Sequence, residues 1–241
     1  MKYNRFCREL IEGAAFLPPE FLKYLDPVSG NDRGRIYRIA PRGFKQPPPP
    51  RLGDASSQEL VSLLENSNGW HRDTASRLLY QRQDATVTAE LEKVALTSDL
   101  AEGRMAALYS LDGLGTLSER ILLQALADHA PLVRNHALKL TESQLATSPG
   151  LVAAICSMTD DPDMRVRYQL AFSLGAAEGR ARNRALVDIA LHDSADSWMA
   201  LAIQSSLDRG AGDVLGLLAR DPVYRATGHG SQLLVNLAGQ I

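Results

Sequence analysis

The sequence is poor in the residues that build disulfide frameworks, zinc sites and membrane spans. It has only two cysteines, Cys7 and Cys156, which lie far apart and outside any CxxC or zinc-type spacing. Cys156 falls in an apolar helical run, where a small buried side chain is the simplest interpretation. No run approaches the roughly 18 apolar residues of a membrane helix, and the first residues lack the apolar stretch of a secretion signal. We therefore expect a soluble, unexported chain, and the redox compartment stays undetermined.

Aromatic residues and net charge are also scarce. Aromatic residues make up 6% of the chain, and 26 Lys and Arg against 28 Asp and Glu leave a formal charge of -2. This balance excludes a bulk electrostatic attraction to nucleic acid or anionic lipid. Leu and Ala are abundant instead, which favours packed helices over a β-sandwich.

The sequence lacks the usual signatures of a catalytic or metal centre. It contains no GxSxG motif, phosphate loop or dinucleotide fingerprint. His129 and His136 are seven residues apart with a turn between them, which is not the i,i+4 spacing of a helical metal pair. The segment 113–115 (Gly-Leu-Gly) is typical of a helix end. We therefore predict no catalytic, cofactor-binding or metal-binding residue, expect no cofactor, and expect no activity from this chain alone.

The chain divides into three zones. Residues 1–46 form an irregular N-terminal extension that ends in a strand-like RIYRIA at 35–40. Residues 47–56 form a proline-rich linker whose tract at 47–50 favours a stiff polyproline spacer of about 12 Å. Residues 57–241 read as repeated helical pairs.

The helical zone repeats with a period of 30 to 33 residues. Aligned on the second helix of each unit, one anchor position carries Arg72, Arg104, Arg134, Arg167 and Met199. The position three residues later carries Ala75, Ala107, Ala137, Leu170 and Ala202. Such a period marks a helical solenoid, because each pair exposes an apolar face that only its neighbours can cover. We predict an all-α, right-handed α-solenoid of about five to six helical pairs.

The turns before the second helices indicate the repeat type. They are rich in residues that end one helix and cap the next, namely Asn68, Asp99, Asp128, Asp161, Asp163, Asp193 and Asp196. With the anchor arginine they give a DP-x-x-x-R pattern that favours HEAT repeats. The strict 34-residue pattern of TPR repeats and the TPLHxA turn of ankyrin repeats are both missing.

Two segments resemble a more specific family. They are IEGAAFLPPEFLKYLDPVSGNDRGRIYRIAPRGF at 11–44 and NSNGWHRDTASRLLYQRQD at 66–84. Together they resemble the PVC-type membrane-bound dehydrogenases, or haem-binding CxxCH proteins, over about residues 3–85. In that family a β-propeller is followed by HEAT repeats and often by a cytochrome c module.

This resemblance implies that residues 1–44 correspond to the closing strand of a propeller blade and 47–50 to its junction with the repeats. The rest of the propeller, which would hold the quinone cofactor, is missing from the sequence, as is a CxxCH motif for haem. We therefore do not carry oxidoreductase activity over. If the chain is a piece of such an enzyme, its location is periplasmic.

A candidate partner-binding surface follows from the repeat register. It consists of Trp70, Arg72, Arg77, Arg104, Arg134 and Arg167, since Trp and Arg are enriched among residues that dominate interfaces. The alternative favoured by the sequence is structural, with Trp70 packed between repeats or against a propeller and Asp73 paired with Arg77.

Three hypotheses for function follow. The first is a non-catalytic HEAT-repeat scaffold that binds another protein or joins a dehydrogenase propeller to another module. The second is a fragment or accessory part of a periplasmic quinoprotein (glucose/sorbosone-type) dehydrogenase. The third is a HEAT-like nucleic-acid-binding protein, suggested by a cluster of arginines, Arg165, Arg167, Arg180, Arg182 and Arg184, although neither a nucleic-acid partner nor membrane insertion is expected.

Overall fold

The structure is a computed structural model that describes residues 18–23, 39, 41–45 and 50–241. The chain divides after Pro49, and the two parts are described separately. In the first part the described residues include one short helix, α2 (Pro19–Leu22). The predicted strand at 35–40, the propeller-like segment and most of the proline tract lie outside the described residues.

The second part, 50–241, consists of helices, and no strand occurs among the described residues of the chain. The first helices of the successive pairs are α3 (Ser57–Leu63), α5 (Thr88–Thr97), α7 (Glu119–Leu126), α9 (Pro149–Cys156), α11 (Arg180–His192) and α13 (Ala211–Leu218). The second helices are α4 (Gly69–Arg82), α6 (Ala101–Gly113), α8 (Pro131–Thr141), α10 (Met164–Ser173), α12 (Ser197–Ser205) and α15 (Gly228–Ala238). Shorter elements are α14 (Pro222–Ala226), η3 (Leu52–Asp54), η4 (Ala85–Val87) and η5 (Leu174–Ala176).

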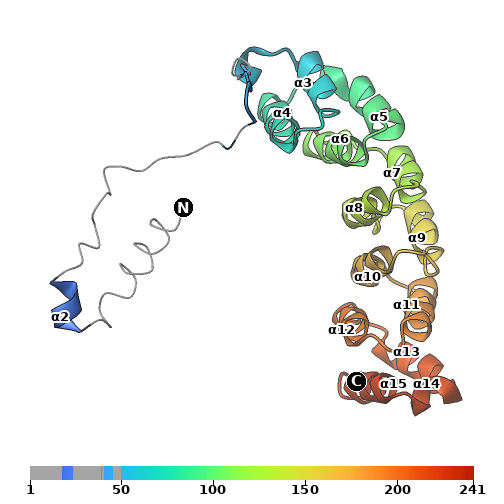
Figure 1. The fold of residues 1–241 in the computed structure, drawn as a ribbon. Helices are drawn as coiled ribbons and strands as arrows, with labels where there is room; N and C mark the ends of the chain where they lie inside the picture. The colour runs from blue at the N-terminus through green and yellow to red at the C-terminus, as the bar shows by residue number, and fades with distance from the viewer. Residues whose placement is uncertain (1–17, 24–38, 40, 46–49) are drawn as a thin grey trace. The chain divides into compact units, whose positions relative to one another are not determined.

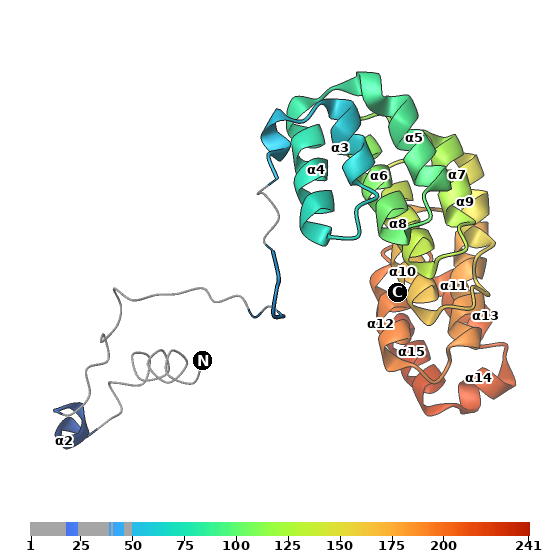
Figure 2. The ribbon, with the colours of Figure 1, turned by 45° about the horizontal axis from the view of Figure 1, so that its top comes forward.

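These helices form two layers. Each first helix packs against the next first helix, from α3 through α13, and each second helix packs against the next second helix, from α4 through α15. Figures 1 and 2 show this part as a curved stack in which the second helices lie on the inner, concave side and the first helices on the outer side. The predicted all-helical architecture is thus confirmed, and the arrangement is consistent with an α-solenoid.

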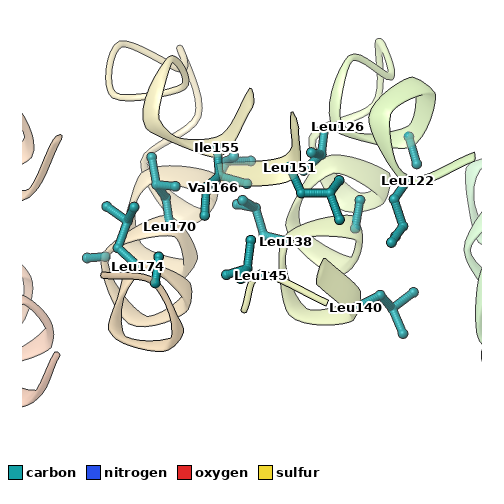
Figure 3. Packing of buried hydrophobic residues seen from close by; sticks show 14 of the residues in the cluster. Leu122, Leu126, Leu138, Leu140, Leu145, Leu151, Ile155, Val166, Leu170 and Leu174 are labelled. Carbon is teal, nitrogen blue, oxygen red and sulfur yellow. The ribbon is translucent and has the colours of Figure 1, made fainter. Parts of the chain in front are cut away.

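The space between the layers is filled by aliphatic side chains. Figure 3 shows a central section, in which Leu122 and Leu126 of α7 lie on one side of Leu151 of α9. Ile155 of α9 lies on the other side, close to Val166 of α10. Each fully buried leucine contributes about 1.5 to 3 kcal/mol relative to an exposed one. One continuous core therefore joins every unit to the next.

The positions three residues after each anchor are buried, as the alignment predicted. Ala75, Ala107, Ala137 and Leu170 are inaccessible to solvent, and Ala202 is 1% exposed. Because these residues face the neighbouring helices, the small size of the four alanines sets how closely the second helices approach there.

The turns provide the expected side-chain caps for some of the second helices but not for others. The side chains of Asn68, Asp163 and Asp196 accept hydrogen bonds from the first turns of α4, α10 and α12. The helices α6 and α8 begin without a side-chain cap. The end of α6 is a glycine turn, with Gly115 at φ 67°, as the sequence predicted.

Candidate interaction surface

The anchor arginines lie between the repeats, and each makes the same local contact. Each donates through Nη1 to a backbone carbonyl six residues earlier, in the turn of its own unit. Arg72 reaches the carbonyl of Asn66 at 2.6 Å, and Arg104 reaches that of Ser98 at 2.6 Å. Arg134 and Arg167 repeat this contact at 2.8 and 2.6 Å with Asp128 and Asp161. The spacing of six residues between the carbonyl and the arginine is the same in each unit, because the units share the same turn and the same first helical turn.

Three of the anchors also reach the next unit, and we call these pairs the Arg–Asp ladder. The pairs are Arg104 with Asp128, Arg134 with Asp161, and Arg167 with Asp193. In each pair Nε and Nη2 donate to the two carboxylate oxygens at 2.6 to 2.8 Å. The planar guanidinium matches a carboxylate in this two-bond geometry. The ladder therefore fixes the spacing of four consecutive units.

The ladder carboxylates are stabilised as anions. For Asp128, burial raises the pKa, but hydrogen bonds from Arg104 and from the backbone of Ala130 outweigh it and hold the pKa below its usual value. For Asp193, burial likewise raises the pKa, and the bonds from Arg167 and His192 outweigh it. Both carboxylates therefore stay ionised at neutral pH.

This geometry corrects the expected role of three anchors. Arg104 and Arg167 are only 2% and 7% exposed, and the side chain of Arg134 is 11% exposed. Their donor groups are satisfied inside the chain, so these side chains hold the units together and do not line the concave surface. The six-residue spacing from each aspartate to the following anchor is the sequence signal that would have identified this role.

The other predicted surface residues are more accessible. Trp70 is 55% exposed, with its ring in an edge contact 5.2 Å from that of His71, so within the described residues it is not packed between repeats. Arg77 is exposed, and no ion pair joins it to Asp73 in the described chain. Arg72 is half-buried. Trp70 and Arg77 thus remain available for a partner.

Two rows of partly or fully exposed residues run along the second helices, and we call them the inner surface. The row one residue after the anchors is Asp73, Met105, Asn135, Tyr168 and Ala200. The row five residues after the anchors is Arg77, Tyr109, Lys139, Phe172 and Gln204. The two rows are four residues apart, so they share one helix face, opposite the buried positions. The second helices that carry these rows lie on the concave side of the stack in Figure 1.

Aromatic contacts order part of the inner surface. The hydroxyl of Tyr109 lies 2.8 Å from Nδ1 of His136 on the next helix, and the two rings are 5.5 Å apart. Burial, with a smaller contribution from Lys139, lowers the pKa of His136, which favours the neutral ring. Tyr168 and Phe172 make an edge contact at 5.0 Å. The centre of the surface is therefore aromatic and preorganised.

The arginine cluster at 165–184 has little free positive charge. Arg165 pairs with Asp163, Arg167 belongs to the ladder, and Arg184 pairs with Asp188. Arg182 is 2% exposed and donates to the carbonyls of four residues, namely Leu174, Ala177, Ser206 and Arg209. Arg180 is exposed and unpaired in the described chain.

The remaining sulfur and histidine groups have local roles. Cys156 packs against the core and is half-buried, and burial raises the pKa of its thiol. Nδ1 of His129 lies 3.5 Å from the ladder carboxylate Asp128. Among the described residues no group of His, Cys, Asp and Glu has metal-site geometry, and no helix is long and apolar enough to cross a membrane.

Comparison of the chain with protein-family models and with curated proteins finds no match in either case.

Proposed function

We propose that this chain is a right-handed HEAT-type repeat scaffold without catalytic activity, and that it binds a partner protein on its inner surface. The main support for this proposal is that two sets of side chains on the second helices have different roles. The anchor arginines of the ladder bind the aspartates of the next unit and so join the units. The residues five positions after these anchors, Tyr109, Lys139 and Phe172, are exposed. The HEAT assignment rests on the regular Asp-to-Arg spacing and the two-layer stack.

The chemistry of the inner surface supports a protein partner. Tyr109 and Phe172 are 39% and 41% exposed, and Leu201, beside the same rows, is 51% exposed. In the row five residues after the anchors, these aromatic groups alternate with Arg77 and Lys139. Exposed aromatic side chains beside charged ones suit an interaction site, and tyrosine provides much contact area at a low entropic cost. Extended concave surfaces of this kind are what solenoids present to partners.

The test is affinity capture with matched surface variants. Tyr109→Ala and Phe172→Ala together remove the aromatic centre, and Leu123→Ala is the control, because Leu123 is 37% exposed on the outer helix α7. We expect partners captured from the native cell by the wild type and by the control to be lost from the double variant, with unchanged circular dichroism. Equal capture by all three proteins would remove the inner surface as the site.

A second proposal is that the scaffold joins, or is an accessory part of, a periplasmic quinoprotein dehydrogenase. The first inner helix favours a large neighbour, because Trp70 and Tyr80 on α4 are 55% and 61% exposed. This proposal also uses the resemblance of residues 11–44 and 66–84. Sequencing the genomic DNA upstream of Met1 tests it: an open frame that encodes propeller strands supports it, and a ribosome-binding site at Met1 argues against it.

Nucleic-acid binding is less well supported, because the chain neutralises most of its arginine cluster with its own carboxylates and carbonyls. It predicts salt-sensitive retention on DNA, and no retention at about 50 mM salt would dismiss it.

A further inference from the structure

A groove of about 680 Å³ lies between the outer helices α11 and α13, away from the inner surface. These two helices are neighbours in both views of the stack (Figures 1 and 2). The groove is lined by Arg180, Asn183, Gly212, Asp213, Gly216, Leu217 and Arg220. Its volume is within the range of ordinary ligand sites.

Two glycines line the groove along α13. Gly212 and Gly216 are four residues apart and therefore on one face of the helix. A side-chain carbon added at Gly216 would meet no atom within 4 Å. Each glycine makes the helix less stable than alanine would, by about 1 kcal/mol. A binding role for the groove would explain why the helix keeps two glycines there despite this loss of stability.

Two arginines of the groove have no side-chain partner among the described residues. Besides the ladder, exposed arginines such as Arg120 and Arg209 have carboxylate partners. The guanidinium groups of Arg180 and Arg220 have no hydrogen-bond or ion-pair partner among the described residues. Arg180 begins α11, and Arg220 lies just past the end of α13, about 12 Å along that helix from Gly212. The groove thus has a cation toward each end.

Hydrogen bonds hold the side chains at the end of the groove near Arg180. The Asn183 side chain is 7% exposed, accepts a hydrogen bond from buried Arg182 at 2.9 Å, and donates to the carboxylate of Asp213 at 3.1 Å. The amide nitrogen of Asn183 carries a second hydrogen, and no second acceptor for it is found among the described residues. The helices α11 and α13 both start at glycine N-caps without a side-chain cap, so their first backbone N–H groups add positive potential here.

We propose that this groove binds an extended acidic peptide segment of a partner protein, with one carboxylate on Arg180 and a second on Arg220. In an extended chain, side chains i and i+4 point to the same side and lie about 13 Å apart, which is close to the rise of about 12 Å along α13 between Gly212 and Arg220. Asp213 selects a peptide over a nucleic acid, because a peptide backbone offers N–H donors to this carboxylate and a phosphate backbone does not. The site is independent of the inner surface.

The test measures fluorescence anisotropy of a labelled, end-blocked peptide, Gly-Glu-Val-Ser-Val-Glu-Gly, with the purified full chain. We expect binding that weakens with salt, and binding at least tenfold weaker for the peptide with glutamine in place of both glutamates. Arg180→Gln and Arg220→Gln should each weaken binding about tenfold. Arg184→Gln is the control, because Arg184 pairs with Asp188 on α11 and does not line the groove.

A second variant separates loss of the site from loss of fold. Gly216→Leu places a side chain in the groove at a position where an added Cβ meets no atom within 4 Å, and it raises helix propensity, so it should keep the fold and abolish peptide binding. The proposal is overturned if the acidic peptide does not bind at about 1 mM, a concentration at which even weak sites fill. It is also overturned if Gly216→Leu binds as the wild type does, or if a thymidine oligonucleotide of equal charge displaces the peptide equally well. None of these results depends on whether the inner surface binds a partner.

Discussion

Arg134 and Asp161 join two neighbouring repeats through two hydrogen bonds of 2.7 Å, and their side chains are 11% and 6% exposed. The same arginine also holds the carbonyl of Asp128 in its own turn. One side chain therefore ties together the turns of two units. Equivalent pairs, Arg104 with Asp128 and Arg167 with Asp193, join the units before and after this one. The structural role of these pairs can be tested by substitution.

Arg134→Met should destabilise the chain by about 3 kcal/mol, because it leaves the carboxylate of Asp161 buried without its cation. The measurement is the free energy of unfolding in urea. Arg209→Met is the matched control, since Arg209 and Glu178 form a pair in which both side chains are more than 70% exposed. That variant should stay within about 0.5 kcal/mol of the wild type. Similar losses from both variants would contradict a structural role for the ladder.

Ser98→Asp should extend the ladder by one pair. Ser98 lies six residues before Arg104, at the position that Asp128 occupies in the next unit, and like Asp128 it accepts a backbone hydrogen bond from two residues later. The new carboxylate would face Arg72, and the expected gain in unfolding free energy is about 1 kcal/mol. In an Arg72→Gln background the same change should instead destabilise. A loss of equal size in both backgrounds would exclude the pairing.

Stability should fall in acid because of the ladder carboxylates. The pKa values of Asp128 and Asp193 are lowered in the folded chain. The unfolded chain therefore takes up protons first, so the stabilisation is complete above the unfolded pKa of about 3.9 and is lost as the pH falls through the folded values. Urea unfolding at pH 7, 5, 4 and 3 should show a plateau followed by a decline. Asp193→Asn should be less stable at pH 7 and decline less steeply.

Ala137→Leu should destabilise by about 1 to 3 kcal/mol, since Ala137 is inaccessible to solvent and the added atoms would overpack α8 against its neighbours. Ala181→Leu on α11 is the control, because that alanine is exposed. Thermal unfolding followed by circular dichroism measures both. A fold that accepts leucine at 137 without loss would show that the layers are loosely packed there.

The repeat period was readable from the sequence because each unit needs the same contacts. Ala107 and Ala137 recur at one helix position, and both are buried as predicted. The recurrence of arginine at the anchor was also visible, but its role was not. An arginine that recurs in each repeat suggests a binding surface equally well, and the pairing of Arg134 with Asp161 spans 27 residues.

The exposed groups were harder to predict because exposure depends on neighbouring helices. Trp70 was expected to pack against other parts, yet its ring is more than half exposed within the described chain. The α11/α13 groove arises from two glycines and from arginines 40 residues apart in sequence, Arg180 and Arg220. Nothing in the local pattern around either arginine indicates that they share a groove.

We expect the ladder to determine the order in which the repeats unfold. Its pairs join the inner helices from α6 to α12, whereas Ser98 leaves Arg72 without a carboxylate at the first junction and Met199 ends the series. In a solenoid each unit is held only by its neighbours. Amide hydrogens of α8 and α10 should therefore exchange with solvent last, and a mechanical load applied to the two ends should peel units off inward and leave this central block intact longest.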